Sequence, residues 1–280
     1  MNKHTASDPL KSPTRNAGGS RPVRPRVSIV VPLRDEAENI VPLVEEIRQV
    51  LEPLCPYEIL LVDDASKDGT REVCISLVTA FPGMRLICHD DPAGQSAAIH
   101  SGVRAARANL VATLDGDGQN PPAHLASLLA PFLAPASDPA LGLVAGQRVG
   151  RKDSLSKRLA SRFANVLRMT VLRDGTRDTG CGLKAFRQDA YLALPYFDHQ
   201  HRYLPALFAR DGWRIELVDV THAARRHGRS KYGNLRRAFV GIWDLLGVAW
   251  LIRRRKRTIP REIVVNDHAL GGSGQSGRAQ

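Results

Sequence analysis

One repeated pattern constrains the fold of this chain more than any other feature. From Val27 onward, a short apolar run, a polar turn and a stretch of helical periodicity follow one another several times. The first run is continuously apolar, which is typical of a strand buried on both faces of a parallel sheet. Strands that alternate with helices imply right-handed crossover units. The sequence therefore predicts an α/β fold with a mostly parallel central sheet. The expected strands are Val27–Leu33, Glu58–Val62, Met84–Cys88, Leu110–Leu114 and Leu141–Ala145, and the expected helices are Ala37–Leu51, Thr70–Thr79, the small-residue, tightly packing Ser96–Arg107, and His124–Leu133.

Acidic residues follow two of these strands. Asp63 and Asp64 come at the end of the second strand, and Asp115 and Asp117 come directly after the fourth. Ligands of open α/β sheets bind beyond the carboxyl ends of the strands. We therefore expect these four acids to line one active-site crevice.

The Asp115-Gly116-Asp117 segment, with Gln119 close behind, suits a divalent cation. Glycine between the acids lets backbone and carboxylates approach a shared ligand. Oxygen ligands at this spacing can hold Mg²⁺ together with phosphate oxygens, and the ion would neutralise a diphosphate leaving group. A surface turn is the plain alternative, since Asp-Gly is common in turns. An EF-hand is excluded because the twelfth position counted from Asp115 is Ala126 rather than glutamate.

The acids after the second strand also have a plain explanation, because Asp68 or Thr70 can cap the next helix. Capping leaves Asp63 and Asp64 unexplained, and these favour a ligand at the edge of the sheet. The chain has neither a Walker lysine motif nor a G-x-G-x-x-G fingerprint. A P-loop enzyme and a dinucleotide-binding dehydrogenase are therefore disfavoured.

Length and charge narrow the classes further. The 280 residues, 43% of them hydrophobic, suffice for one large α/β domain or two small ones. Most of the net charge of +12 lies in residues 1–26, with six Lys/Arg against one Asp, and in residues 253–257, with five Lys/Arg. A nearly neutral middle argues against a nucleic-acid partner and favours contact of the basic ends with an anionic membrane. Four dispersed cysteines indicate neither a zinc site nor a disulfide framework and suit a reducing cytoplasm. No apolar run follows the basic N-terminus, so we expect no secretory signal.

Three segments, read in order, resemble the signatures of family 2 glycosyltransferases. They are Val31-Pro-Leu-Arg-Asp-Glu-Ala-Glu-Asn-Ile40, Val62-Asp-Asp-Ala-Ser-Lys-Asp-Gly-Thr70 and Leu114-Asp-Gly-Asp-Gly-Gln119. Within that family the chain looks like a dolichol-phosphate mannosyltransferase or a bacterial polyprenyl-phosphate relative. The resemblance implies a single Rossmann-like, GT-A type nucleotide-diphospho-sugar transferase domain at 26–235. We expect a disordered basic tail at 1–25, an amphipathic, membrane-associating helix with a basic cluster at 236–257, and a flexible tail at 258–280.

The resemblance also implies roles for individual residues. Arg148 lies in a G-x-R segment that would face the acceptor phosphate, and Arg162 resembles a second such arginine. Arg225 and Lys231 match the R-x-x-G-x-S-K segment that reaches phosphates. The implied catalytic residues are Asp117, Asp178, Arg148 and Arg162. The implied donor-binding residues are Pro32, Glu36, Asp63, Asp64, Asp115, Gln119, Arg225 and Lys231, and the implied ligands of Mg²⁺ or Mn²⁺ are Asp115, Asp117 and Gln119.

Two positions depart from the family pattern. The aromatic residue usual in P-x-Y-N-E is Arg34 here, and the asparagine is Asp35. An aromatic side chain cannot stack on the nucleobase from this position, although a guanidinium can also stack on a flat face. The arginines themselves have a plain reading as solvated surface charges. Phosphate-bearing substrates would change that reading, because guanidinium binds phosphate oxygens in pairs.

The implied reaction transfers a sugar, from GDP-mannose or from a UDP-sugar such as UDP-glucose or UDP-galacturonate, to polyprenyl phosphate with inversion. The product would serve cell-envelope glycan synthesis or lipopolysaccharide modification. A phosphate monoester is largely ionised at neutral pH, so its attack needs little help from a base. The alternative is a family 2 enzyme with a hydroxyl acceptor on a polysaccharide or glycolipid, for which Asp178 would become an essential base. A non-enzymatic binder has no use for acids clustered at strand ends.

The apolar segment Phe239–Ile252 is interrupted by Asp244 and followed by arginines. Its fourteen residues are too few for a comfortable bilayer span. It is either a core helix or an interfacial helix with Trp243 and Trp250 at the lipid headgroups. A lipid acceptor favours the second alternative. We therefore expect a peripheral protein on the cytoplasmic face of the plasma membrane, attached directly or through a small integral-membrane partner.

Overall fold

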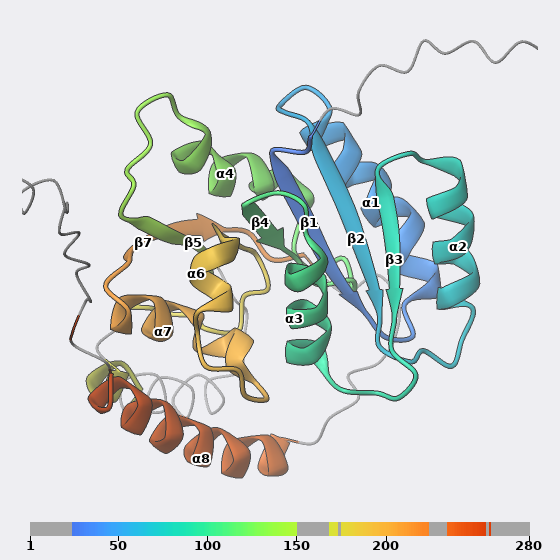
Figure 1. Cartoon of the computed structure of the whole chain (residues 1–280). Coiled ribbons are helices and arrows are strands. Elements are labelled where there is room, and N and C mark those ends of the chain that lie inside the picture. Colours follow the sequence, from blue (N-terminus) through green and yellow to red (C-terminus); the bar gives the residue numbers. More distant parts are fainter. Residues whose placement is uncertain (1–23, 150–167, 173–174, 224–233, 256–257, 259–280) are drawn as a thin grey trace, which may run out of the picture.

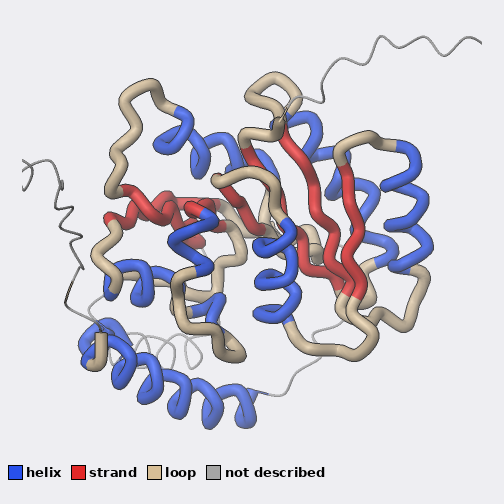
Figure 2. The backbone as a smooth tube through the Cα atoms, in the orientation of Figure 1, coloured by secondary structure: helices blue, strands red, loops and turns tan. Residues whose placement is uncertain are grey.

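A seven-stranded, mostly parallel sheet forms the centre of the molecule, with helices on both of its faces (Figure 2). The computed structural model describes residues 24–149, 168–172, 175–223, 234–255 and 258. The strand order is β3-β2-β1-β4-β6-β5-β7. The strands are β1 Val27–Leu33, β2 Tyr57–Asp63, β3 Met84–Cys88, β4 Leu110–Thr113, β5 Leu141–Arg148, β6 Lys184–Arg187 and β7 Arg214–Val220. The helices are α1 Ala37–Leu51, α2 Thr70–Ala80, α3 Gln95–Ala105, η1 Pro122–His124, α4 Leu125–Leu133, α6 Gln188–Leu192, η2 Gln200–Arg202, α7 Leu204–Arg210 and α8 Asn234–Arg253.

The predicted α/β class is confirmed, and every predicted strand and helix is present with ends that differ by a few residues. Strands β1, β2, β3 and β4 pair in parallel, and so do β5 and β7. Strand β6 was not predicted, and it runs antiparallel between β4 and β5. Its four residues begin with a lysine and end with an arginine, so no apolar run announces it.

The two faces of β1 enter two different cores, as the continuous apolar run predicts. Val27, Ile29 and Val31 pack with α1, α2 and α4, whereas Val30 packs with the core that includes α3, α6 and α7. All four side chains are fully buried. A strand that is buried on both faces is held firmly in the sheet, so the position of its carboxyl end is fixed. The loop that follows it, which carries part of the site, starts from this fixed position.

The C-terminal helix α8 packs on the protein with one side and leaves large apolar side chains exposed on another. Val248 is buried and packs with the α7 side of the core, whereas Trp243 and Trp250 are 74% and 60% exposed. Among the residues that the structure describes, no helix has the length and apolar character required to cross a bilayer.

Helix α3 packs closely on β1 and β2, as its small residues predict. A methyl group added at Gly102 would lie 2.4 Å from Val30 Cγ1 and 3.1 Å from Val62 Cγ2. The glycine therefore sets the distance between helix and sheet, and this places the first residues of α3 at the carboxyl edge of the neighbouring strands (Figure 1).

We expect Gly102→Ala to lower the free energy of unfolding by about 1–3 kcal/mol, because the added methyl group overpacks a full core. The matched control is Gly247→Ala in α8, where nothing lies within 4 Å of the added carbon. That variant should gain up to about 1 kcal/mol from helix propensity alone. Urea unfolding followed by circular dichroism measures both, and equal stability of the two variants would contradict the packing argument.

Candidate active site

The loops that follow β1 and β2 are tied to each other at the carboxyl edge of the sheet. The backbone N–H of Asp35 donates to Ser66 Oγ at 2.9 Å, and the N–H of Glu36 donates to Thr70 Oγ1 at 2.8 Å. The N-cap of α2 is Gly69 and receives no side-chain cap hydrogen bond, so the prediction that Asp68 or Thr70 caps this helix is wrong. Asp68 does accept the N–H of Thr70, the first helical residue, at 2.9 Å. The two loops consequently form one rigid rim.

Asp63 and Asp64 are both buried and both fully engaged with this rim. Asp63 accepts the N–H of Ser66 at 3.1 Å and Arg71 Nε at 2.9 Å. Arg71, which lies on α2, is therefore the counter-ion of this fully buried carboxylate. Asp63 therefore positions the loop that borders the site.

Asp64 connects the end of β2 to the loop between β3 and α3. It accepts the N–H groups of Ala93 and Gly94, each at 2.8 Å, and pairs with His89 Nδ1 at 2.8 Å. Burial alone would raise the pKa of Asp64, but the hydrogen bonds from Ala93, His89 and Gly94 bring it below its ordinary value. Asp64 is thus an ionised carboxylate that holds two loops in register.

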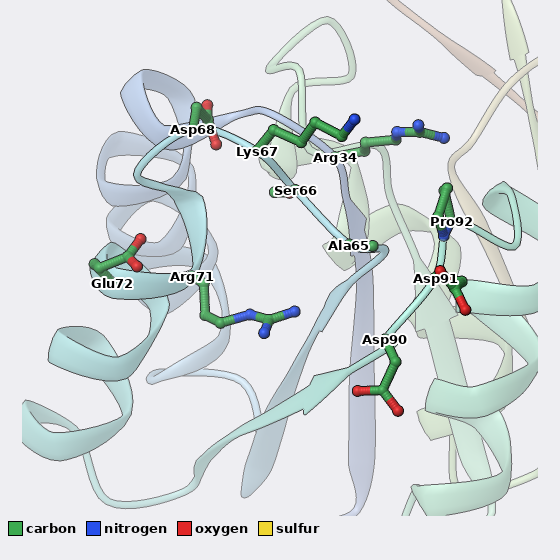
Figure 3. Close-up of a pocket in the computed structure, with 10 residues that line it drawn as sticks. All are labelled: Arg34, Ala65, Ser66, Lys67, Asp68, Arg71, Glu72, Asp90, Asp91 and Pro92. Carbon is green, nitrogen blue, oxygen red and sulfur yellow. The ribbon is translucent and has the colours of Figure 1, made fainter.

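A groove of about 460 Å³ opens between these two loops (Figure 3). Arg34 and Lys67 extend along one side of it, while Asp90 and Asp91 lie on the other. The Arg34 guanidinium lies 4.0 Å from Asp64, and its side chain is 38% exposed. The groove is thus lined by charged side chains of both signs, and Arg34 is a partly exposed cation among them. Its remaining lining residues are Ala65, Ser66, Asp68, Arg71, Glu72 and Pro92.

The Asp115-Gly116-Asp117 turn packs directly against the end of β1. A Cβ at Gly116 would lie 2.5 Å from Leu33 Cδ2 and 3.1 Å from the carbonyl oxygen of Pro32. The glycine therefore serves close packing as well as chain flexibility. This approach brings the acids of the turn beside Pro32 and Glu36, as the predicted crevice requires.

Asp115 is held in place by two amides. Gln95 Nε2 donates to its Oδ1 at 2.7 Å, and Asn120 Nδ2 donates to its Oδ2 at 2.8 Å. Burial raises the pKa of Asp115, and the negative charge of Asp117 raises it further. Asp117 accepts the N–H of Gln119 at 3.1 Å. Two carboxylates that repel each other at a fixed turn are a place where a bound cation lowers the energy.

Arg148 and Asp178 form a bidentate ion pair with side chains that are each 15% exposed. Arg148 Nε and Nη2 donate to the two carboxylate oxygens at 2.5 and 2.9 Å. Burial alone would raise the pKa of Asp178, but its hydrogen bond and charge interaction with Arg148 bring it below the ordinary value. A carboxylate with a lowered pKa is a weak general base. Asp178 is therefore placed to orient Arg148.

The Arg148–Asp178 pair and the Asp115 turn belong to one site. The chain segment that carries Gly180 and Gly182 passes close to both. A Cβ at Gly182 would lie 2.3 Å from Asp115 Oδ1, and one at Gly180 would lie 2.9 Å from Arg148 Nη2. Lys184, 3% exposed, follows on β6. Burial lowers the pKa of Lys184, and the charges of Asp115 and Asp178 oppose that shift. The charges of these residues therefore act on one another.

The donor set at Asp115 and Asp117 fits a hard divalent cation. Carboxylate oxygens are the ligands that Mg²⁺ and Mn²⁺ accept in proteins. Burial and the charge of Asp117 raise the pKa of Asp115, whereas the charges of Lys184 and Arg148 oppose that shift. In the described part of the chain, no group of three or more His, Cys, Asp or Glu side chains has a metal-binding arrangement. A cation here would therefore complete its coordination with ligands from outside that set, such as phosphate oxygens or water.

The structure brings together most of the predicted site residues but leaves three unplaced. Arg162, Arg225 and Lys231 lie outside the described residues. Ala223, the last described residue before this gap, donates its N–H to the carbonyl oxygen of Gln119 at 3.0 Å.

Four contributing residues escaped the sequence analysis. Gln95 and Asn120 hold Asp115, His89 holds Asp64, and Gly182 makes room for the Asp115 carboxylate. Asn120 follows the acidic turn closely and could have been considered with it. Gln95 and His89 lie in the loop and helix start after β3. The adjacent acids Asp90 and Asp91 in that loop, which the sequence analysis did not consider, could have pointed to this segment.

Comparisons with known proteins agree with this architecture. The sequence model of the family described as Glycosyl transferase family 2 matches residues 28–194. The chain is 34% identical over 236 residues to the dodecaprenyl-phosphate galacturonate synthase of Rhizobium johnstonii, covering 82% of this chain and 68% of the relative. It is 31% identical over 224 residues to the undecaprenyl-phosphate 4-deoxy-4-formamido-L-arabinose transferase of Yersinia enterocolitica, covering 79% and 66%. The chain thus spans about two thirds of the length of these relatives.

Solved structures share the fold. A mannosyltransferase from Pyrobaculum calidifontis in complex with GDP-Man and Mn²⁺ superimposes with a TM-score of 0.58 at 22% identity, covering 85% of this chain and 66% of that one. Glucosyl-3-phosphoglycerate synthase from Mycobacterium tuberculosis, in complex with Mn²⁺, UDP and phosphoglyceric acid, gives a TM-score of 0.59 at 18% identity, covering 82% and 78%.

We expect Asp178→Asn to lower the free energy of unfolding by about 3 kcal/mol at pH 7, because Arg148 loses its buried counter-ion. Asp219→Asn is the matched control. It breaks the Arg177–Asp219 pair, whose side chains are 68% and 58% exposed, and should cost no more than about 1 kcal/mol.

The effect of Asp178→Asn should also depend on pH. Because the pKa of Asp178 is lowered in the folded protein, the pair stabilises it above the ordinary value of 3.8. That contribution is lost as the pH falls through the folded pKa. The stability difference between wild type and Asp178→Asn should therefore be constant near neutrality and shrink below pH 3.8. Chemical unfolding at several pH values measures it, and a difference that grew toward low pH would contradict the ion-pair assignment.

Proposed function

Because the chain belongs to glycosyl transferase family 2, we propose that it transfers a sugar from a nucleotide diphosphate donor to the phosphate of a polyprenyl phosphate lipid. The observation that carries this proposal is the buried Arg148–Asp178 pair next to the Asp115 turn. It joins a phosphate-binding cation to a cation-binding turn in one site. The names of the two bacterial relatives, both polyprenyl-phosphate sugar transferases, support the choice of acceptor.

The donor would lie along the carboxyl edge of the sheet. The groove between the β2 and β3 loops would accept the nucleoside, with Arg34 stacking on the base in place of the missing aromatic side chain. Pro32, Glu36 and Asp64 would border that part of the site. The diphosphate would then reach the Asp115 turn, where Gln119 is available as a further oxygen ligand and where Arg225 and Lys231 would add positive charge.

Asp115 and Asp117 would hold Mg²⁺ or Mn²⁺. When bound, that ion neutralises the charge that builds up on the leaving nucleoside diphosphate. The complexes of two structural relatives with Mn²⁺ and nucleotide support this dependence on a metal.

The acceptor would bind at Arg148, and Arg162 would assist it. Two guanidinium nitrogens of Arg148 donate to Asp178 in the free protein, and the acceptor phosphate would displace this carboxylate or share the nitrogens with it. One acceptor oxygen then attacks the anomeric carbon, the bond from that carbon to the donor diphosphate breaks, and the nucleoside diphosphate leaves. A single displacement inverts the configuration at the carbon and needs no covalent sugar–enzyme intermediate.

Asp178 is what distinguishes this reaction from transfer to a hydroxyl group. A hydroxyl acceptor must lose a proton, whereas a phosphate monoester has a second pKa of about 6 and is already largely ionised at neutral pH. A carboxylate that is engaged by Arg148 and has a lowered pKa suits the second case. The alternative of a polysaccharide or glycolipid hydroxyl acceptor is therefore the weaker one.

The identity of the sugar remains a set of candidates. Mannose, glucose, an amino sugar and a uronic acid such as galacturonate all fit the proposed reaction. A uronic acid is included because the cations expected in the site, such as Arg148, could meet an additional carboxylate. The enzyme would act at the cytoplasmic face of the plasma membrane as a peripheral protein, with or without a small integral-membrane partner, and on a lipid that serves cell-envelope glycan or lipopolysaccharide modification.

The proposed function is tested with a panel of nucleotide sugars, undecaprenyl phosphate and Mn²⁺ or Mg²⁺, with the lipid product weighed by mass spectrometry. We expect Asp117→Asn to lower kcat/KM by more than about 100-fold, because a ligand of the charge-neutralising ion is lost. Calorimetry should show weaker Mn²⁺ binding in the presence of nucleoside diphosphate and an unchanged Tm. Asp219→Asn is the control and should retain both turnover and Mn²⁺ binding. Full turnover by Asp117→Asn would exclude the metal assignment.

The pH dependence identifies the source of the attacking charge. With a phosphate acceptor, kcat/KM should fall below about pH 6, where the acceptor gains a proton. Asp178→Asn should raise the KM for the acceptor but keep this acid limb, because the limb belongs to the lipid phosphate. If the variant instead lost the limb together with kcat, Asp178 would be the base and the hydroxyl alternative would gain.

A further inference from the structure

Helix α8 has one face that the protein covers and one that it leaves open. Val248 is 1% exposed, and Leu245, Leu251 and Ile252 pack against the same core. On the opposite side, four large apolar side chains are each more than half exposed. They are Ile242, Trp243, Leu246 and Trp250, with exposed fractions of 54%, 74%, 55% and 60%. With 3.6 residues per turn, these four positions fall within an arc of about 100°. We call this set the α8 apolar face.

The one acid within the apolar part of the helix does not interrupt this face. Asp244 Oδ2 lies 3.1 Å from His199 Nδ1, and its side chain is 18% exposed. The carboxylate is therefore turned toward the protein, next to η2. Asp244 therefore does not lie among the exposed side chains of the α8 apolar face.

Positive charge borders the α8 apolar face. Arg253 and Arg254 follow it directly, and both are exposed. Arg253 lies seven residues after Leu246, so helical periodicity places it on the same side as the apolar face. Tryptophan and arginine side by side are typical of helices that lie at a lipid headgroup layer, since tryptophan is amphipathic and arginine attracts anionic lipid.

Helix α8 runs along the same side of the molecule as the active site. The carboxyl ends of β1, β2 and β3 point toward the side along which α8 runs (Figure 1). Polar contacts connect the two regions through η2. His199 joins α8, and His201 Nδ1 lies 2.7 Å from Ser96 Oγ at the start of α3. The neighbouring Gln95 contacts Asp115. A surface in contact with the α8 apolar face would therefore face the reaction site as well.

We propose that the α8 apolar face docks on an anionic phospholipid bilayer, with the helix lying in the headgroup layer, and thereby brings the active site to its lipid acceptor. The choice of a lipid occupant rests on the proposed function. Charge argues against a second copy of this chain. Both ends of α8 are basic in sequence, with Arg236 and Arg237 at one end and Arg253 and Arg254 at the other. Two copies paired along this helix, in either direction, would bring arginines against arginines, whereas anionic headgroups neutralise them.

The experiment measures co-sedimentation of the full chain with vesicles of phosphatidylcholine and phosphatidylglycerol, without donor or acceptor. We expect wild type to bind and the double variant Trp243→Ser/Trp250→Ser to bind more than about tenfold more weakly, because two interfacial anchors are lost. Arg253→Gln/Arg254→Gln should weaken binding by about fivefold for each arginine, and this loss should disappear at high salt.

Val41→Ser/Ile75→Ser is the matched control. These apolar residues are 51% and 52% exposed on α1 and α2, on the other half of the sheet from α8 (Figure 1). The control should bind vesicles like wild type. Quenching of tryptophan fluorescence by brominated lipids in wild type provides a second readout that needs no variant.

The proposal is overturned if Trp243→Ser/Trp250→Ser binds vesicles as wild type does, or if wild type shows neither binding nor quenching. A change of oligomeric state in that variant with unchanged vesicle binding would instead assign the face to a second copy. Activity toward a water-soluble short-chain isoprenyl phosphate separates the two proposals. The tryptophan variant should retain it, whereas vesicle binding without any such transfer would defeat the proposed function alone.

Discussion

Burial of carboxylates at the carboxyl edge of the sheet is the constraint on which the site depends. An ionised carboxylate removed from water is costly unless hydrogen bonds and opposite charge surround it. Here Asp63 is paired with Arg71, Asp64 with two backbone N–H groups and His89, and Asp178 with Arg148. Each pair crosses between different loops or strands. The requirement to satisfy these charges therefore also fixes the loops relative to one another, and so builds a rigid site before any ligand arrives.

Asp115 is the exception that gives this edge its chemistry. It accepts two amide hydrogen bonds but faces the negative charge of Asp117, and its pKa is raised rather than lowered. Its neighbours thus stabilise the carboxylate less completely than those of Asp64 and Asp178 do. Asp115 and Asp117 are two negative charges beside each other, and a cation bound at this turn would offset both. The same reasoning explains why glycine is required at 116 and 182, since a side chain at either would displace the turn.

The Arg148–Asp178 pair combines stability with recognition. A phosphate that binds Arg148 must compete with Asp178 for the same two nitrogens, or share them, so the free protein already holds the guanidinium in a bidentate orientation. Folding therefore already includes part of the entropic cost of ordering this side chain, and ligand binding does not add that part again. The low pKa of Asp178 is a consequence of the same pair, and it is why this acid supports an arginine better than it accepts a proton.

The sequence by itself determined the fold class, the positions of five strands along the chain, and the acids that follow two of these strands. These features are local, since a continuous apolar run and the acid that follows it can be read from adjacent residues. Strand β6 and the residues Gln95, Asn120 and His89 could not be read in this way, because their roles come from partners distant in the chain or from a sheet edge that only pairing defines. Helix α8 shows the same limit most clearly. Its composition indicated both a core helix and an interfacial helix, and only the packed structure decided which side chains belong to each face, because turning Asp244 toward His199 requires a partner 45 residues away.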